Sequence, residues 1–292
     1  MPRVICAGHV NWDVTLRVDH LPEPDGEAVI EAETGAGGGS AANVAGGLAG
    51  LDVRTTLFGS VGDDDHGTEV RAELADAGVD CETLVRADGA TAVKYLVVAD
   101  DGRVMVLGRD GANEAFSATD LAAERLAAAD HLHLTSHDPE TAATLVDRAH
   151  AVGVPVSFDP GRRVGDRGFE GALDGADVVF LNDREAAAAL DADLSPEGRT
   201  FVLKHGPRGA EVRTSTETHT HPGFAVDTVD TTGAGDAFAA GFLASRLGGG
   251  GYDRALAVAN ACGALAASSL GARTTLDWDA VDRLLGATID TD

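Results

Sequence analysis

The chain has 292 residues, of which 44% are hydrophobic and 24% are charged, and its 48 acidic and 22 basic residues give a formal net charge of -26. This length and apolar content allow one large α/β domain, or one domain with a small appendage, and exclude an intrinsically disordered chain. Because the acid excess repels nucleic acid and anionic membranes, we expect neither as a partner.

The charge excess has two interpretations, an ordinary acidic protein or adaptation to concentrated salt. At 1 M salt the Debye length shrinks to about 3 Å, so the self-repulsion is screened. The size of the excess, together with Lys94 and Lys204 as the only lysines, favours salt adaptation. No segment approaches the ~20 apolar residues needed to span a bilayer, and the first residues lack the features of a secretion signal. We therefore expect a cytoplasmic location.

Strand-like and helix-like segments alternate along most of the chain. Apolar runs predict buried strands at residues 3–10, 54–61, 131–136, 154–160, 176–182 and 200–206. Helical patterns are found at residues 66–78, 140–152, from 183 onward, 234–247, 253–269 and 277–285. Buried strands that alternate with helices predict a mostly parallel sheet covered on both faces, which is a three-layer α/β/α domain.

Two regions break this alternation. Residues 14–34 and 92–109 have the pattern of short alternating strands joined by turns, and the sequence Asp-Asp-Gly at 100–102 is a hairpin signal. The two regions are far apart in the sequence. They can pair into one small sheet beside the main domain, or remain two separate surface hairpins.

The segment DTTGAGDAF, residues 230–238, places a glycine-rich turn directly before a small, apolar helix. Free N–H groups at a helix N-terminus bind anions, and Gly233 and Gly235 allow a ligand to approach closely. The Asp236 carboxylate would repel a passively bound phosphate. It suits a site where a carboxylate takes a proton from a hydroxyl while the N–H groups hold the phosphoryl group being transferred. The alternative is an ordinary acidic residue in a first helical turn.

Further candidate segments follow other predicted strands. GAGGGSAANVAGG, residues 35–47, is a second glycine-rich turn into a helix, while NDRE (182–185) and KHGPRGA (204–210) each come directly after a strand. The carboxyl ends of parallel strands share one edge of a sheet, where open α/β folds bind their ligands. Neither a Walker A motif nor a GxGxxG fingerprint occurs, which argues against a dinucleotide-binding oxidoreductase.

Together these motifs resemble the PfkB-type carbohydrate kinases of the ribokinase-like superfamily over nearly the whole chain. DTTGAGDAFAAGF is similar to that family's C-terminal signature and GGGSAANVA to its N-terminal signature, while NDRE matches its NxxE motif and NWD (11–13) its sugar-binding NxD. The resemblance implies a single ribokinase-like domain over residues 1–292. Residues 14–34 and 92–109 would form a small β-sheet lid, which often doubles as a homodimer contact. It also implies ATP-dependent phosphorylation of a small sugar or sugar acid.

The resemblance further implies a role for each matching position. Asp236 would be the catalytic base, and the N–H groups of Gly233, Ala234 and Gly235 would form the anion hole. The sugar would contact Asn11, Asp13, Gly38, Gly39, Asn43, Arg109 and Arg163. The nucleotide would contact Asn182, Lys204, Gly206, Gly209 and Asn260. Glu185 would help to organise Mg²⁺, partly through water, and Asp230 and Thr232 would border a possible K⁺ site.

The sequence does not identify which sugar is the substrate. Ser40 stands where ribokinases and 1-phosphofructokinases usually have Lys, whereas FDPGRR at 158–163 is closer to the DPNxR of fructokinases and 2-keto-3-deoxygluconate kinases, with Gly161 in place of Asn. A nucleoside kinase on the same fold would need aromatic stacking in the lid, where Tyr95 stands almost alone. A catalytically silent sugar sensor would need a defective Asp236 or anion hole, and both are intact.

Some of these residues also have a simpler explanation. Asp13 could be a turn residue, although Asn11 two positions earlier puts both side chains on one side of an extended segment and favours sugar contact. Arg109 can bind a substrate carboxylate or phosphate, or can be solvated. His131, His133 and His137 suit one strand face better than a metal site. The acidic run at 63–66 precedes a helix and suits an N-cap.

Overall fold

The structure is a computed structural model, and it describes residues 1–101, 103–190, 198–269, 271 and 273–287. In this part of the chain the main sheet has the strand order β13-β12-β11-β10-β9-β8-β1-β4-β5. Its strands are β1 (Arg3–Ala7), β4 (Arg54–Gly62), β5 (Leu84–Ala87), β8 (His131–Thr135), β9 (Val156–Asp159), β10 (Val178–Asn182), β11 (Thr200–Lys204), β12 (Ala210–Arg213) and β13 (Thr218–His221). Only β12 and β13, at one edge of this described sheet, are antiparallel to their neighbours.

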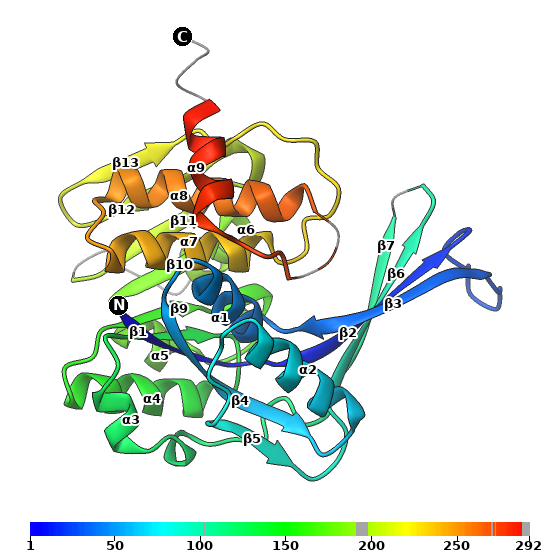
Figure 1. Ribbon diagram of the computed structural model, residues 1–292, viewed down its shortest axis with the longest axis horizontal. Coiled ribbons are helices and arrows are strands. Elements are labelled where there is room, and N and C mark those ends of the chain that lie inside the picture. Colours follow the sequence, from blue (N-terminus) through cyan, green and yellow to red (C-terminus); the bar gives the residue numbers. More distant parts are fainter. Residues whose placement is uncertain (102, 191–197, 270, 272, 288–292) are drawn as a thin grey trace.

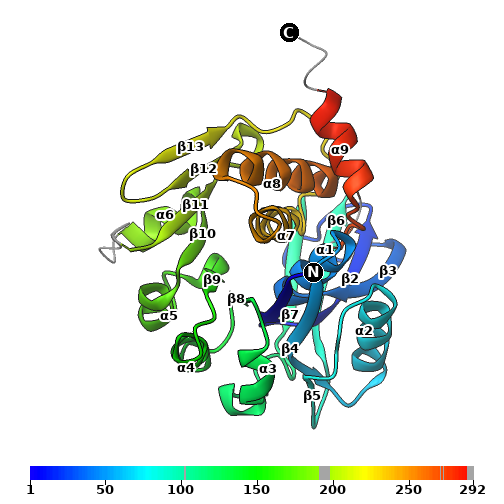
Figure 2. The same ribbon diagram turned by 60° about the vertical axis from the view of Figure 1, so that its left-hand side comes forward.

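Helices cover both faces of this sheet (Figures 1 and 2). One face carries α1 (Ser40–Gly50), α2 (Asp65–Asp76), α7 (Ala234–Leu247), α8 (Tyr252–Ala267) and α9 (Trp278–Ala287). The other carries α3 (Ala123–Ala127), α4 (Pro139–Ala151), α5 (Glu170–Gly175) and α6 (Asp183–Leu190). Alternate residues of β1 face opposite sides of the sheet. Val4 and Cys6 pack into the hydrophobic core on one side, and Ile5 and Ala7 pack into the core on the other. This confirms the predicted three-layer α/β/α fold.

The two irregular regions pair with each other. They form a second sheet of the order β3-β2-β6-β7, built from β2 (Asn11–Val18), β3 (Ile30–Gly38), β6 (Ala92–Ala99) and β7 (Val104–Arg109). The central pair β2–β6 is parallel and the outer pairs are antiparallel. Figure 1 shows this sheet projecting from the main domain. Gly102 of the hairpin signal lies outside the described residues.

Several boundaries differ from the sequence prediction by one to three residues. The first strand ends at Ala7 rather than at residue 10, because the chain enters the second sheet at Asn11. Asp64 caps α2 by accepting from the Gly67 N–H at 3.0 Å, as the capping interpretation predicted. None of the described helices is long and apolar enough to cross a membrane.

Candidate active site

Helix α7 begins at the carboxyl edge of the main sheet. Its N-cap is Gly233, whose φ of 75° is left-handed and therefore favours glycine. The Ala234 N–H, predicted as part of the anion hole, instead donates to the Thr231 carbonyl at 3.2 Å. Within the described chain, the Gly233 and Gly235 N–H groups have no acceptor. The helix N-terminus therefore presents donors and a partial positive charge to an anion.

The Asp236 carboxylate lies in the first turn of α7. Its Oδ2 accepts a hydrogen bond from Asn43 Nδ2 in α1 at 2.9 Å, which joins the two glycine-rich segments. Burial raises the pKa of Asp236 to about 6, against the opposing effect of the Asn43 bond. A carboxylate with such a pKa can accept a proton from a hydroxyl near neutral pH.

Lys204 ends β11 and lies among acidic side chains. Its Nζ donates to Asp159 Oδ2 at 2.5 Å. Burial alone would lower the pKa of Lys204, but the Asp159 and Glu185 carboxylates outweigh burial and raise it. A Cβ added at Gly235 would lie 3.7 Å from this Nζ, so the ammonium lies beside the N-terminus of α7. Asp159 was not predicted, since its partner is 45 residues away.

The NDRE segment forms a reciprocal cap at the start of α6. Asn182 Oδ1 accepts from the Arg184 and Glu185 N–H groups at 3.0 Å, and Glu185 Oε2 accepts from the Asn182 N–H at 2.8 Å. This capping box fixes Glu185, which is buried, with its carboxylate toward Asp159 and Lys204. Burial and the Asp159 charge raise the pKa of Glu185.

This donor set fits a nucleotide-bound magnesium ion. Among the described residues there is no group of three or more His, Cys, Asp or Glu side chains that could hold a metal alone. Mg²⁺ prefers oxygen ligands, keeps several waters, and is bound by one or two carboxylates together with substrate phosphates. Glu185 and Asp159 supply such carboxylates.

A group of unpaired polar atoms lies across from Asp236. Asn11 Oδ1 accepts from Asn113 Nδ2 at 2.9 Å, which positions the Asn11 side chain. Three of the buried atoms that lack a hydrogen-bond partner in the described part of the chain lie here: Asn11 Nδ2, Asp13 Oδ1 and Asn43 Oδ1. A Cβ at Gly38 would collide with the Asp13 carboxylate, so this position needs glycine. Buried polar groups without partners are costly, and these suit a ligand with several hydroxyls.

The remaining predicted residues lie on several different elements. Gly39 is the N-cap of α1, and Gly206 and Gly209 form the turn between β11 and β12. Asn260 is buried in α8 and donates to the Leu256 carbonyl at 2.8 Å. Arg109 donates to the Thr91 carbonyl at 3.3 Å from the exposed strand β7.

The Asp230 carboxylate lies just before α7. Its Oδ1 accepts from the Thr232 N–H at 2.8 Å and its Oδ2 from the Gly271 N–H at 3.2 Å. These bonds tie the loop before α7 to the chain after α8. Each of its two carboxylate oxygens therefore keeps a further lone pair.

The Trp12, His131 and His133 side chains already contact other side chains. Trp12 stacks on His66 with ring centroids 5.0 Å apart and is buried, so it offers no free stacking face. His131 Nε2 and His133 Nδ1 share Ser157 Oγ at 2.7 and 2.8 Å. These two histidines therefore lie on one face of β8, as predicted.

Comparison with known proteins agrees with the fold. A sequence profile described as pfkB family carbohydrate kinase matches residues 1–279. A protein of Halopiger xanaduensis named ATP-dependent ribose-1-phosphate kinase is 56% identical over 297 residues, covering 99% of this chain and 100% of that protein. A nucleoside kinase of Methanothermobacter thermautotrophicus is 30% identical and covers 84% of this chain and 83% of its own length. The crystal structure of ribokinase from Thermotoga maritima superposes with a TM-score of 0.87 at 24% identity, covering 98% of this chain and 99% of that one.

Proposed function

Since the chain belongs to the pfkB family of carbohydrate kinases and is an ATP-dependent sugar kinase, we propose that its substrate is ribose 1-phosphate. The name of the 56% identical relative supports this substrate, because the two chains align over nearly their full lengths. The observation that carries the kinase chemistry is Asp236, a carboxylate in the first turn of α7 with a pKa raised to about 6. Asn43, which donates to it, also carries one of the unpaired polar atoms.

In the proposed reaction, a free hydroxyl of the sugar attacks the γ-phosphorus of ATP, its proton passes to Asp236, and ADP leaves. The Gly233 and Gly235 N–H groups would stabilise the charge on the transferring phosphoryl group. Lys204 would add positive charge on the same side. Mg²⁺, when bound near Glu185 and Asp159, would neutralise phosphate charge.

Other side chains would orient the reactants. Asn11, Asp13 and Asn43 would hold sugar hydroxyls through their unpaired atoms. The nucleotide would lie over the turns at Gly206 and Gly209, with Asn182 near its phosphates and Asn260 near its base. The accepting hydroxyl would be the one farthest from the existing phosphate, because that arrangement keeps the two phosphoryl groups apart.

A K⁺ ion would lie beside Asp230 and Thr232. Its role would be to stiffen the loop before α7, so that the N–H groups stay aimed at the phosphoryl group.

The second sheet would close over the sugar as a lid and also join two copies of the chain. Its strands expose a set of large apolar side chains: Ile30, Tyr95, Val104, Met105, Val106 and Leu107. Met105 and Leu107 share one face of β7, and Leu107 pairs with Tyr95 of β6 on that face. Exposed apolar surface of this kind marks protein interfaces. Light scattering should give the mass of a homodimer, and Leu107→Glu should shift it toward the monomer. A wild-type monomer at micromolar concentration would contradict this arrangement.

The substrate is tested by measuring ADP release over a panel in molar KCl. The panel holds ribose 1-phosphate, ribose 5-phosphate, ribose, fructose, 2-keto-3-deoxygluconate and adenosine. We expect the highest kcat/KM with ribose 1-phosphate. A higher value with adenosine would favour a nucleoside kinase, and a higher value with an unphosphorylated sugar would refute the proposed substrate.

A further inference from the structure

A cavity of about 320 Å³ lies beside Asn11, one of the residues proposed to hold the sugar. Its lining comes from the chain after β1, the loop after β7 and the short helix η2 (Gly161–Arg163) after β9. The polar lining residues and the loop glycine are His9, Asp110, Gly111, Asn113, Glu114 and Arg163. Asn113 also donates to Asn11, so one lining residue of the cavity contacts the groups proposed to hold the sugar.

The Glu114 carboxylate in this cavity is fully engaged. Arg167 donates to it in a bidentate manner, from Nη1 to Oε1 at 2.6 Å and from Nη2 to Oε2 at 3.0 Å. His9 Nε2 lies 3.0 Å from Oε1 and donates there, because an ionised carboxylate can only accept. The bonds from His9 and Arg167 lower the pKa of Glu114 far below its ordinary value. Its charge is therefore balanced and does not oppose an anion in the cavity.

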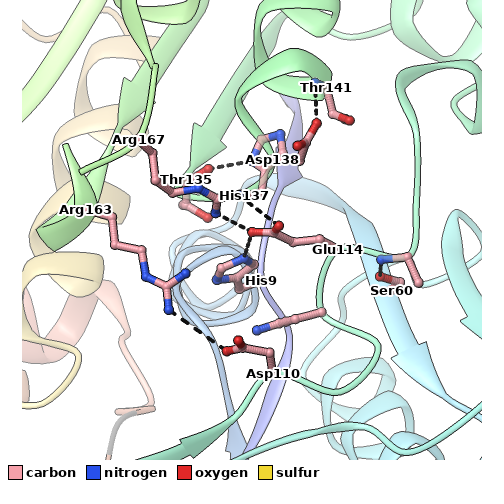
Figure 3. A network of polar contacts seen from close by, with 12 residues as sticks. His9, Ser60, Asp110, Glu114, Thr135, His137, Asp138, Thr141, Arg163 and Arg167 are labelled. Atoms are coloured by element: carbon pink, nitrogen blue, oxygen red, sulfur yellow. Dashed lines mark hydrogen bonds and ion pairs between the residues drawn. The ribbon is translucent and has the colours of Figure 1, made fainter. Parts of the chain in front are cut away.

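The His9 and Arg163 side chains face the cavity. Figure 3 shows the His9 ring between the Glu114 carboxylate and the Arg163 guanidinium. With Nε2 held by Glu114, Nδ1 is the ring nitrogen of His9 that is left for a ligand. Among the described residues, the acidic partner of Arg163 is Asp110, at 4.0 Å and with both side chains exposed. Such a pair contributes little, so the planar guanidinium can turn to an incoming oxyanion.

The negative charge of the whole chain makes a cationic side chain at this cavity a specific feature of it. With a formal net charge of -26, most of the surface repels an anionic substrate. An anion that binds beside these groups needs a local cation, and Arg163 provides one in the cavity lining, with the His9 ring in the same lining. The Asp110 side chain, 86% exposed, is screened by solvent.

We propose that the cavity between His9 and Arg163 binds the phosphate already present on the sugar, and that Glu114 and Arg167 position His9 for this contact. The proposal rests on the proposed function, because it assigns the phosphate of that same substrate to a place in the fold. His9 and Arg163 would bind the phosphate oxygens, whereas Glu114 and Arg167 act through His9. The site would thereby make the protein prefer a sugar phosphate over the free sugar as substrate.

Arg163→Gln is the direct test, and Arg162→Gln is its matched control. Both arginines are exposed in the same short helix, but Arg162 does not line the cavity. Loss of one or two charge-assisted hydrogen bonds should raise the KM for ribose 1-phosphate about 10- to 100-fold. The KM for ATP should change less than twofold in either variant. The ratio of kcat/KM for ribose 1-phosphate to that for ribose should fall with Arg163→Gln and stay unchanged with Arg162→Gln.

Glu114→Gln tests the positioning of His9. The ratio of kcat/KM for ribose 1-phosphate to that for ribose should fall in this variant, and the KM for ATP should change less. Inorganic phosphate, used as a competitor of ribose 1-phosphate, should bind more weakly. If Glu114 had only a structural role, the kcat/KM values for both sugar substrates and the KM for ATP would change to a similar extent. That result would overturn the positioning role.

The outcomes separate the two proposals. If the wild-type protein does not use ribose 1-phosphate, the proposed function fails and the phosphate site falls with it. If it uses ribose 1-phosphate and Arg163→Gln keeps the wild-type substrate ratio, the function stands and the site is refuted. A preference for a sugar acid that is lost in Arg163→Gln would show that the cavity binds a carboxylate, which also overturns the proposal.

Discussion

Replacing Asp236 by Asn removes a proton acceptor while keeping the shape of the side chain. The amide oxygen can still accept the hydrogen bond from Asn43 Nδ2, now 2.9 Å from Asp236 Oδ2. Because the proton of the sugar hydroxyl loses its acceptor, kcat should fall about 10²- to 10⁴-fold. The Kd of ATP should stay nearly unchanged, since the Gly233 and Gly235 N–H groups are retained.

The same substitution has a predicted effect on stability. Burial raises the Asp236 pKa from 3.8 to about 6. A shift of about two units corresponds to at most about 3 kcal/mol at 1.36 kcal/mol per unit. Because the folded state holds the proton more tightly than the unfolded state, wild type loses stability as the pH rises from about 4 to 6. Asp236→Asn avoids this loss, so it should be more stable than wild type at pH 7 and gain nothing below pH 4.

The assays are ADP release for kcat, titration calorimetry for ATP, and thermal unfolding between pH 4 and 8, all in molar KCl. Asp279→Asn serves as control, because Asp279 also lies in the first turn of a helix, α9, but is exposed. If the variant kept more than about a tenth of wild-type kcat, Asp236 would not be the base. A stability difference that is the same at pH 4 and pH 7 would refute the pKa argument.

Three further predictions follow from the sugar contacts, the charge and the loop before α7. Asp13→Ala should raise the KM for the sugar far more than that for ATP, and equal changes would place Asp13 outside the sugar site. Thermal unfolding should shift to higher temperature from low salt to molar KCl, because screening relieves repulsion at a formal charge of -26, and a flat or falling trend would contradict salt adaptation. Catalysis should be faster in KCl than in NaCl at matched ionic strength and stability, because a site at Asp230 selects by ion size, and equal kcat values would leave screening as a sufficient explanation.

The sequence predicts the main domain because its signals are local. Apolar runs identify the central parallel strands, and the Gly-Ala-Gly-Asp turn identifies the start of α7. The acid excess favoured salt adaptation, and the 56% identical relative comes from a halophile. The short strands β12 and β13 lack a strong apolar run and were not predicted.

The contacts that complete the site join residues far apart in the sequence. Asn113 pairs with Asn11 over 102 positions, and Arg167 pairs with Glu114 over 53. A single sequence gives periodicity within each element, but does not show which loops meet at the sheet edge. The Ala234 N–H donates to the Thr231 carbonyl, and residue types do not reveal this local geometry either.

The most direct test of the proposed substrate is a competition in one reaction. Equal concentrations of ribose 1-phosphate, ribose and adenosine are incubated with limiting ATP in molar KCl, and the products are measured by mass spectrometry at low conversion. The product ratio then equals the ratio of kcat/KM values. We expect a ribose bisphosphate to dominate, formed in equal amount to ADP. Predominance of a singly phosphorylated ribose or of a nucleoside monophosphate would contradict a sugar phosphate as the substrate.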